Sequence, residues 1–222
     1  MSFRRILVTM TSKKDETYKD LRYRIVTHEL KPMEPLNEKA LMDHYGLGRT
    51  PMREVLLQLQ RDGLIQRFSR SGTVVSPVDI HIYKHNIEIR TVLEGLAGEL
   101  AAARITAAEL EVLGEILKRV SELEEQEHEN LKELMQCEFD FHTLIYEATH
   151  NPKLIDILHE LQGVSARFWH YQIFSKQELL DQFIDHREVV DAFRKRDGQR
   201  AGETLKNHIQ SVLKKLGDKV LK

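Results

Sequence analysis

The sequence predicts a mainly α-helical protein of two parts, in which three helices and a β-hairpin precede an antiparallel helical bundle. Apolar residues recur at intervals of three and four over most of the 222 residues, which is the spacing that gives a helix one apolar face. Short β-branched runs stand out only near residues 64–75. Ser76-Pro77 follows them directly and marks the expected boundary between the two parts.

The first two helices of the N-terminal part are marked by their ends. An amphipathic helix is expected over residues 15–30, followed by a break at Pro32 and Pro35, because proline restricts the backbone and cannot donate a hydrogen bond. Asn37 is a favourable N-cap for a short second helix, and Gly46 suits its left-handed end.

The third helix and the hairpin follow without a long linker. Thr50 supplies a capping hydroxyl and Pro51 is expected at the first helical position, where its missing N–H costs nothing. The helix ends at Gly63. Residues 64–68 and 73–75 are the two expected strands, and Gly72 in the turn between them can take a positive φ.

From residue 78 onward the helical spacing continues with no further strand signal. Thr106 and Glu109 form a capping box at the start of one of these helices. An antiparallel bundle is the simplest architecture for so many amphipathic helices in sequence. The expected helices cover residues 80–104, 107–127, 131–149, 152–174, 178–196 and 198–221.

Composition excludes several classes of protein. Charged residues make up 31% and hydrophobic residues 41% of the chain, which fits a folded core rather than a disordered chain. No apolar run approaches the roughly 20 residues that span a bilayer, and residues 6–10 are too short for a signal-peptide core. The single cysteine, Cys137, cannot form an intrachain disulfide. We therefore expect a cytoplasmic protein that does not bind membranes.

The charge is unevenly distributed between the two parts. Residues 1–78 contain 14 basic and 9 acidic side chains, whereas the rest contains 19 and 26. A basic module joined to an acidic one indicates a polyanion-binding domain, and the alternative is a chance distribution over solvated helix faces.

Three helices with a hairpin have the layout of a winged helix-turn-helix, whose third helix enters the major groove of double-stranded DNA. Arg49 and Arg53 lie at the start of that helix, and an arginine can hold guanine O6 and N7 together. Thr50 and the free N–H groups beside it suit a phosphate. The alternative is that both arginines are solvated, with Arg53 paired to Glu54 or Glu38. On the hairpin, Arg67 and Arg70 add positive charge.

Four residues of the second part could hold a metal ion. Glu138 and His142 are four residues apart on one helix and therefore share a face. His186 and His208 lie on two later helices among apolar neighbours. If the helices converge, this set suits Zn²⁺, Ni²⁺ or Mn²⁺, whereas a histidine alone is more often a surface or hydrogen-bonded core residue.

The N-terminal part resembles the DNA-binding domain of GntR-family bacterial transcription regulators over residues 15–78. The matching stretches are Leu36-Asn-Glu-Lys-Ala-Leu41, Arg49-Thr-Pro-Met-Arg-Glu54 and Gly72-Thr-Val-Val75. The resemblance implies that Arg49 and Arg53 contact bases, that Thr50 contacts the DNA backbone, and that Gly72 lets the wing approach DNA closely.

The same resemblance has three departures. The family usually has serine at the position of Gly48, which implies that one phosphate contact is lost here. It usually has glycine at the positions of His28 and Met33, which implies a differently shaped turn after the first helix.

Residues 80–215 resemble the FCD ligand-binding domain of the FadR-type branch of that family. The matching stretches are Arg90-Thr-Val-Leu-Glu94, Ala101-Ala-Ala103, Phe141-His142, Ala148-Thr-His-Asn151-Pro152 and the later segment from His186 to His208. Many members bind a divalent metal, which implies ligation by Glu138, His142, His186 and His208. The usual acid is aspartate, so Glu138 is a departure.

The resemblance further implies a small organic acid effector whose carboxylate fills an open position on the metal. Arg90 is a second clamp for such an effector, and its alternative is a salt bridge with Glu88 or Glu94. Arg167 and Tyr171 are further pocket candidates, although that segment is equally compatible with bundle core or a dimer contact.

Together these features predict an effector-responsive transcription regulator that binds a palindromic operator as a homodimer. The expected organisation is an N-terminal extension over residues 1–14, a winged helix-turn-helix DNA-binding domain over 15–76, and a helical domain over 77–222 for effector binding, metal binding and dimerisation. We expect no catalytic residues. The alternatives are a direct metal-sensing regulator and a metal-dependent hydrolase with a basic appendage; the sequence has no His-Glu-x-x-His or Gly-x-Ser-x-Gly motif.

Overall fold

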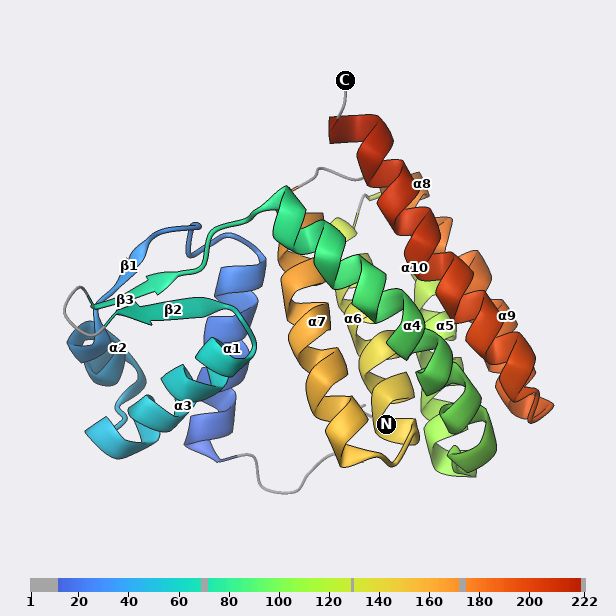
Figure 1. Ribbon diagram of the computed structural model, residues 1–222, viewed down its shortest axis with the longest axis horizontal. Coiled ribbons are helices and arrows are strands. Elements are labelled where there is room, and N and C mark those ends of the chain that lie inside the picture. The colour runs from blue at the N-terminus through green and yellow to red at the C-terminus, as the bar shows by residue number, and fades with distance from the viewer. Residues whose placement is uncertain (1–11, 69–71, 129, 172–174, 221–222) are drawn as a thin grey trace. The chain divides into compact units, whose positions relative to one another are not determined.

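The structure, a computed structural model, describes residues 12–68, 72–128, 130–171 and 175–220 (Figure 1). The side chains of residues 168–171 and 212–220 are not described. The chain forms two compact units. One consists of residues 1–79 with 166–171, and the other of residues 80–165 with 172–222.

The N-terminal unit contains three helices and a three-stranded antiparallel sheet. The strand order is β1-β3-β2, so the expected hairpin of β2 and β3 gains a strand that the sequence did not predict. Pro35 in this added strand pairs with Val74 at the edge of the sheet, where a residue without an N–H is tolerated. The elements are α1 (Lys13–Val26), β1 (Pro35–Leu36), α2 (Glu38–Tyr45), α3 (Arg49–Arg61), β2 (Ile65–Phe68) and β3 (Gly72–Val75).

Most of the predicted helix ends are confirmed, but the start of α3 is not. Asn37 caps α2 by accepting a hydrogen bond from the Ala40 N–H, and Gly46 ends that helix in the left-handed conformation. The N-cap of α3 is Gly48 rather than Thr50, so the prediction of a capping threonine was wrong. Pro51 is therefore the third helical residue. It is tolerated there because the N–H groups of the first helical turn have no partner within the helix.

The turn after α1 keeps a glycine-like backbone without glycine. His28 and Met33 have φ values of 59° and 66°, in the left-handed region that costs a non-glycine residue about 1–2 kcal/mol. These are the two positions at which the related family usually has glycine. The backbone is therefore left-handed at both positions even though this chain has side chains there.

The core of the N-terminal unit joins its helices to its sheet. The apolar face of α1 meets that of α3, and the first residue of β2 and the last residue of β3 complete the contact. Fully or almost fully buried members are Leu21, Ile25, Met52, Val55, Leu56, Leu59, Leu64, Ile65 and Val75.

The second unit is a helical bundle with one more helix than the sequence predicts. The helix expected over residues 178–196 is divided at Asp181, which is both the C-cap of α8 and the N-cap of α9. The elements are α4 (Ile80–Arg104), α5 (Ala107–Glu124), α6 (Leu131–Ala148), α7 (Pro152–Tyr171), α8 (Lys176–Leu180), α9 (Gln182–Arg194) and α10 (Gly198–Val220). None of the helices in the described residues is long and apolar enough to cross a membrane.

Helices α4 and α10 pack along one another with very little space between them (Figure 1). A Cβ atom on Gly98 would lie 2.9 Å from the carbonyl group of Ala201, and one on Gly202 would lie 2.8 Å from the carbonyl oxygen of Gly95. Any larger residue would therefore push the helices apart. This close approach holds α10 against the rest of the bundle, where α6 and α9 also contribute to the core.

Candidate functional site

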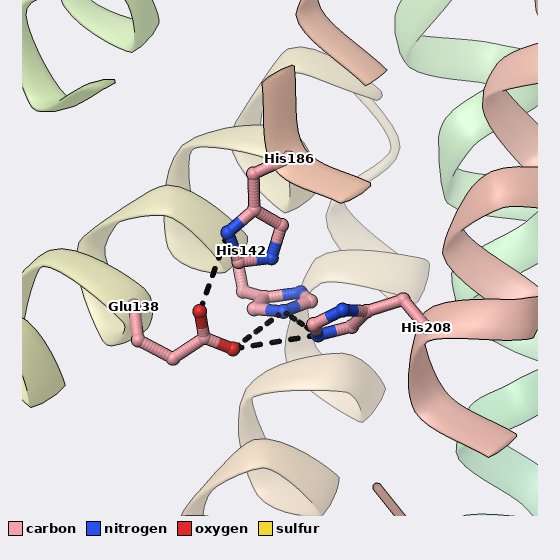
Figure 2. Close-up of side chains that lie close together, drawn as sticks. All are labelled: Glu138, His142, His186 and His208. Carbon is pink, nitrogen blue, oxygen red and sulfur yellow. Dashed lines mark hydrogen bonds and ion pairs between the residues drawn. The ribbon is translucent and has the colours of Figure 1, made fainter. Parts of the chain in front are cut away.

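Three helices bring the four predicted metal ligands together inside the bundle. Glu138 and His142 extend from α6, His186 from α9 and His208 from α10 (Figure 2). One donor atom of each residue lies within 4.8 Å of the donor atoms of the other three. The three imidazoles are fully buried or nearly so. The longer glutamate therefore reaches the position at which the related family usually has an aspartate.

The spacing of the donor atoms fits a single small cation. Glu138 Oε1 lies 3.2 Å from His142 Nε2 and 3.5 Å from His208 Nε2. The two Nε2 atoms are 3.4 Å apart, and Glu138 Oε2 lies 3.3 Å from His186 Nδ1. Donors that surround a metal tetrahedrally at about 2.0–2.1 Å are about 3.3–3.4 Å from one another. An ion at the centre could therefore bind all four groups with little rearrangement.

Several polar atoms of this cluster lack hydrogen bonds. Both ring nitrogens of His186, and Oε2 of Glu138, are buried without a hydrogen-bond partner in the described structure. Leaving such a group unsatisfied costs about 1–3 kcal/mol. The ring of His186 instead stacks on Phe141, at 4.1 Å between centroids, and meets the edge of Phe183. A bound cation would give these atoms the partner that they lack.

Two carboxylates outside the cluster orient two of the imidazoles. Glu94 lies 3.1 Å from Nδ1 of His142, and Asp185 lies 3.3 Å from Nδ1 of His208. A proton on each Nδ1 that is donated to the carboxylate leaves the Nε2 lone pair free to face the other ligands. This is the usual arrangement around a metal-binding histidine.

Glu94 is itself part of a buried polar network. Arg90 donates from Nε to Glu94 at 2.9 Å and from Nη2 to the Tyr146 hydroxyl at 3.1 Å, and that hydroxyl donates to Glu94. Burial disfavours the Glu94 carboxylate, but the charges of His142 and Arg90 outweigh it and lower the pKa of Glu94 to about 2. Glu94 is therefore an anion fixed between a ligand and a buried arginine.

The pKa values of the histidines differ strongly within the cluster. Burial among the two phenylalanine rings lowers the pKa of His186 well below its usual value, so this ring is neutral and its lone pair is available. Burial also disfavours charge on His208, but its hydrogen bonds with Asp185 and Glu138 outweigh this effect and raise the pKa to about 9. A proton therefore has to leave His208 before a cation can bind there.

Sequence reasoning missed the residues that support the cluster. Glu94 was considered only as a salt-bridge partner of Arg90, and Tyr146 and Asp185 were not considered. Tyr146 lies four residues after His142 on the same face of α6, and Asp185 directly precedes His186. These spacings were visible signals for Tyr146 and Asp185. The contact between Glu94 and His142 joins different helices and needs the tertiary structure.

The predicted effector residues are placed very differently from one another. Arg90 is buried beside the cluster, and its Nη1 makes no hydrogen bond with the described residues. Arg167 belongs to the unit formed by residues 1–79 and 166–171, where its guanidinium donates to the carbonyl groups of Ser76 and Pro77. The structure does not bring Arg167 to the cluster. The side chain of Tyr171 lies outside the described part of the chain.

The predicted DNA-contacting residues of α3 lie on the surface. Arg49, Thr50 and Arg53 are exposed at the beginning of the helix. The two acids that could have paired with Arg53 are engaged elsewhere, because Glu54 pairs with Lys14 at 2.8 Å and Glu38 with Arg67 at 3.0 Å. Among the described residues, neither Arg49 nor Arg53 forms an ion pair. Both guanidinium groups are therefore available to a polyanion.

The tip of the hairpin is open on one side. Gly72 has φ = 90°, and a Cβ atom built there would meet nothing within 4 Å in the described residues. Arg70, which the sequence placed on this wing, lies outside the described residues.

Comparisons with known proteins agree on both units. The family described as bacterial regulatory proteins, gntR family, matches residues 13–75, and the FCD domain family matches residues 86–211. The chain is 25% identical over 201 residues to the HTH-type transcriptional repressor RspR of Escherichia coli, covering 89% of this chain and 86% of that protein. It is 27% identical to the repressor GlaR of Escherichia coli, covering 90% and 94%. The solved structure of McbR/YncC from E. coli has the same fold, with a TM-score of 0.79 and 22% identity over 95% of this chain and all of that one.

Proposed function

The chain belongs to the gntR family of bacterial regulatory proteins and carries an FCD domain, and from this premise we propose that it is an effector-responsive transcription regulator in the cytoplasm. In this proposal residues 15–76 bind DNA and residues 77–222 bind the metal, the effector and a second copy of the chain. A dimer with two-fold symmetry places two recognition helices on the two halves of a palindromic operator.

The observation that supports DNA binding is the pair of exposed arginines at the start of α3, neither of them ion-paired among the described residues. Arg49 and Arg53 contact bases in the major groove, and Thr50 and the helix N-terminus contact a phosphate. The wing approaches the DNA backbone at Gly72 and carries Arg70. Repression is the mode that the relatives RspR and GlaR support, since both are named as repressors.

The observation that supports a metal cofactor is the buried cluster with its unsatisfied donors. Glu138, His142, His186 and His208 would hold one divalent cation, for which zinc, nickel and manganese all suit a set of one carboxylate and three imidazoles. Such an ion would supply a site for an anionic oxygen of the effector. Four protein ligands leave one or two positions open if the ion takes five or six ligands.

The effector of this proposal is a small organic acid. Its carboxylate would bind the cation, and Arg90 is the adjoining cationic group, with Nη1 available for a second oxygen. Effector and operator are then linked through the protein, so each changes the affinity of the other by the same factor.

Two other functions use the same cluster. In a direct metal sensor the cation itself is the signal, so operator affinity would change with metal alone and no organic acid would be needed. In a metal-dependent hydrolase the cluster would turn over a substrate without DNA. The relatives are transcriptional regulators, which favours regulation.

Operator binding is tested with Arg53→Ala and a matched control, Arg61→Ala, at the other end of α3. We expect Arg53→Ala to weaken binding to DNA selected from a random library by wild-type protein by about 10- to 100-fold, since a bidentate base contact contributes about 1–3 kcal/mol. Arg61→Ala should change it little. Equal affinity of Arg53→Ala and wild type would contradict the assignment of the recognition helix.

Metal binding is tested by elemental analysis of protein purified without an affinity tag or nickel column. We expect one divalent metal per chain in the wild type, little in His186→Ala, and a full complement in His150→Ala, because His150 pairs with Glu109 outside the cluster. Wild-type protein that stays metal-free after incubation with zinc, nickel or manganese would remove the cofactor from the proposal while leaving DNA binding intact.

A further inference from the structure

One face of α4 is apolar and exposed along much of its length. Of the large hydrophobic side chains that are exposed in the described residues, half lie on this helix, whereas the others are scattered over several elements. Four of them define what we call the α4 stripe: Ile82 (51% exposed), Ile89 (53%), Val92 (64%) and Leu96 (40%).

The spacing of the α4 stripe is that of a helix that packs on another helix. Its members are separated by seven, three and four residues, the repeat by which apolar residues form a straight seam along a helix. The opposite face of α4 already contacts the bundle, with Tyr83, Ile87 and Ala97 buried. The stripe therefore adds a second apolar face that this chain's described residues leave in contact with solvent.

The charges beside the stripe indicate what covers it. Lys84 and His85 lie near its N-terminal end, and Glu99 lies near its C-terminal end, all of them exposed. A second α4 in parallel orientation would place Glu99 against Glu99 and Lys84 against Lys84. An antiparallel copy would instead place Glu99 beside Lys84 and His85, so the face is complementary to itself only when the two helices run in opposite directions.

The same orientation also pairs the apolar residues. If the two-fold axis passes between Ile89 and Val92, then Ile89 of one copy meets Val92 of the other, and His85 meets Leu96. We infer that the α4 stripe is the surface on which a second copy of this chain docks, antiparallel and across a two-fold axis. This inference rests on the homodimer of the proposed function and names the surface that forms it.

The test is the dimer dissociation constant of the full chain, measured by sedimentation at a series of concentrations. Val92→Glu places a charge in the middle of the stripe, and Ile184→Glu is the matched control because Ile184 on α9 is equally exposed at 62%. Loss of a central interface contact weakens binding by about 30-fold or more, and every dimer carries the substitution twice, so we expect roughly a 1000-fold weaker dimer. Ile184→Glu should dimerise as the wild type does.

The orientation has its own test. Lys84→Glu and Glu99→Lys should each weaken the dimer, and the double variant should restore it, because the exchanged charges again face one another in an antiparallel pair. Circular dichroism and melting temperature show that each variant is folded.

The outcomes separate this inference from the proposed homodimer. A wild type that stays monomeric at all concentrations, including with operator DNA present, would overturn both. A dimeric wild type with an equally stable Val92→Glu dimer would overturn the α4 surface while leaving the homodimer. No restoration by the double charge exchange would overturn the antiparallel orientation.

Discussion

Asp185→Asn isolates the effect of an outer carboxylate on metal binding. Asp185 accepts from Nδ1 of His208 at 3.3 Å and is 37% exposed, so removing its charge leaves no buried cation without a partner. The asparagine side chain has nearly the same shape. It can still accept a hydrogen bond through its oxygen, but it no longer supplies a negative charge to the imidazole.

The expected size of the effect follows from the geometry. Loss of an outer partner of a metal-binding histidine typically weakens metal binding by about 10- to 100-fold. A long contact that is partly open to water belongs near the lower limit, so we expect about a 10-fold weaker complex, equivalent to about 1.4 kcal/mol. Because little packing is lost, the melting temperature of the metal-free protein should stay close to that of the wild type.

The assay is competition between the protein and a chromophoric chelator, after removal of metal with a stronger chelator. Asp181→Asn is the control, because Asp181 lies four residues earlier and contacts Gln177 instead of a ligand. It should bind metal with wild-type affinity. Wild-type affinity in Asp185→Asn would refute the reasoning, since His208 would then be oriented without its carboxylate.

Glu94→Gln is the buried counterpart and should behave differently. It removes the partner of His142 and also leaves the Arg90 guanidinium, which is almost fully buried, without its anion. Breaking a buried pair in this way destabilises by about 3–5 kcal/mol. We therefore expect Glu94→Gln to lower both the metal affinity and the melting temperature, whereas Asp185→Asn lowers only the affinity.

Three further predictions concern the same structure. Metal affinity should rise between pH 7 and pH 9, by up to about tenfold per unit, because the pKa of His208 is raised to about 9 and its proton must leave before a cation binds; chelator competition at several pH values checks this, and a flat profile would contradict it. Glu138→Asp should weaken metal binding, even though aspartate is usual in the family, because it withdraws the carboxylate by about 1.5 Å, one carbon–carbon bond, from donors now 3.2–3.5 Å away; unchanged affinity in the same assay would show that α6 can move to compensate. Met33→Gly should stabilise the N-terminal unit by about 0.5–1 kcal/mol, the left-handed strain less the added freedom of the unfolded chain; chemical denaturation measures this, and a loss of stability would show that Met33 is not strained.

Much of the fold could be predicted because local signals agree with the final structure. Asn37, Gly46 and the pair Thr106 and Glu109 end or begin helices as their side chains require. The start of α3 was wrong because Thr50 and Gly48 both suit an N-cap, and proline is tolerated anywhere in a first turn. The sequence offers no local preference that decides between them.

Two other features escaped prediction for physical reasons of different kinds. Strand β1 has only two residues and exists because β3 is beside it, so no periodicity can reveal it. The bend at Asp181 falls inside a continuous apolar spacing through Leu179 and Phe183, both buried, and periodicity does not detect a change of helix direction.

The candidate site could be predicted as a list of ligands but not as an environment. Spacing placed Glu138 and His142 on one face, and the family resemblance supplied His186 and His208. Neither gives the contact of Glu94 with His142, because those residues meet only when α4 packs beside α6. The pKa values of the histidines depend on such contacts and were therefore beyond sequence reasoning.

The order of the ligands along the chain has a consequence for biosynthesis. A ribosome makes α6 first, then α9, and reaches His208 only in α10, so a nascent chain has at most three of the four donors until α10 is made. The last donor arrives on the helix whose Gly202 lets it settle against Gly95 and Gly98 of α4. Loading of the cation and docking of α10 are therefore coupled events, and a chain truncated before α10 would lack both.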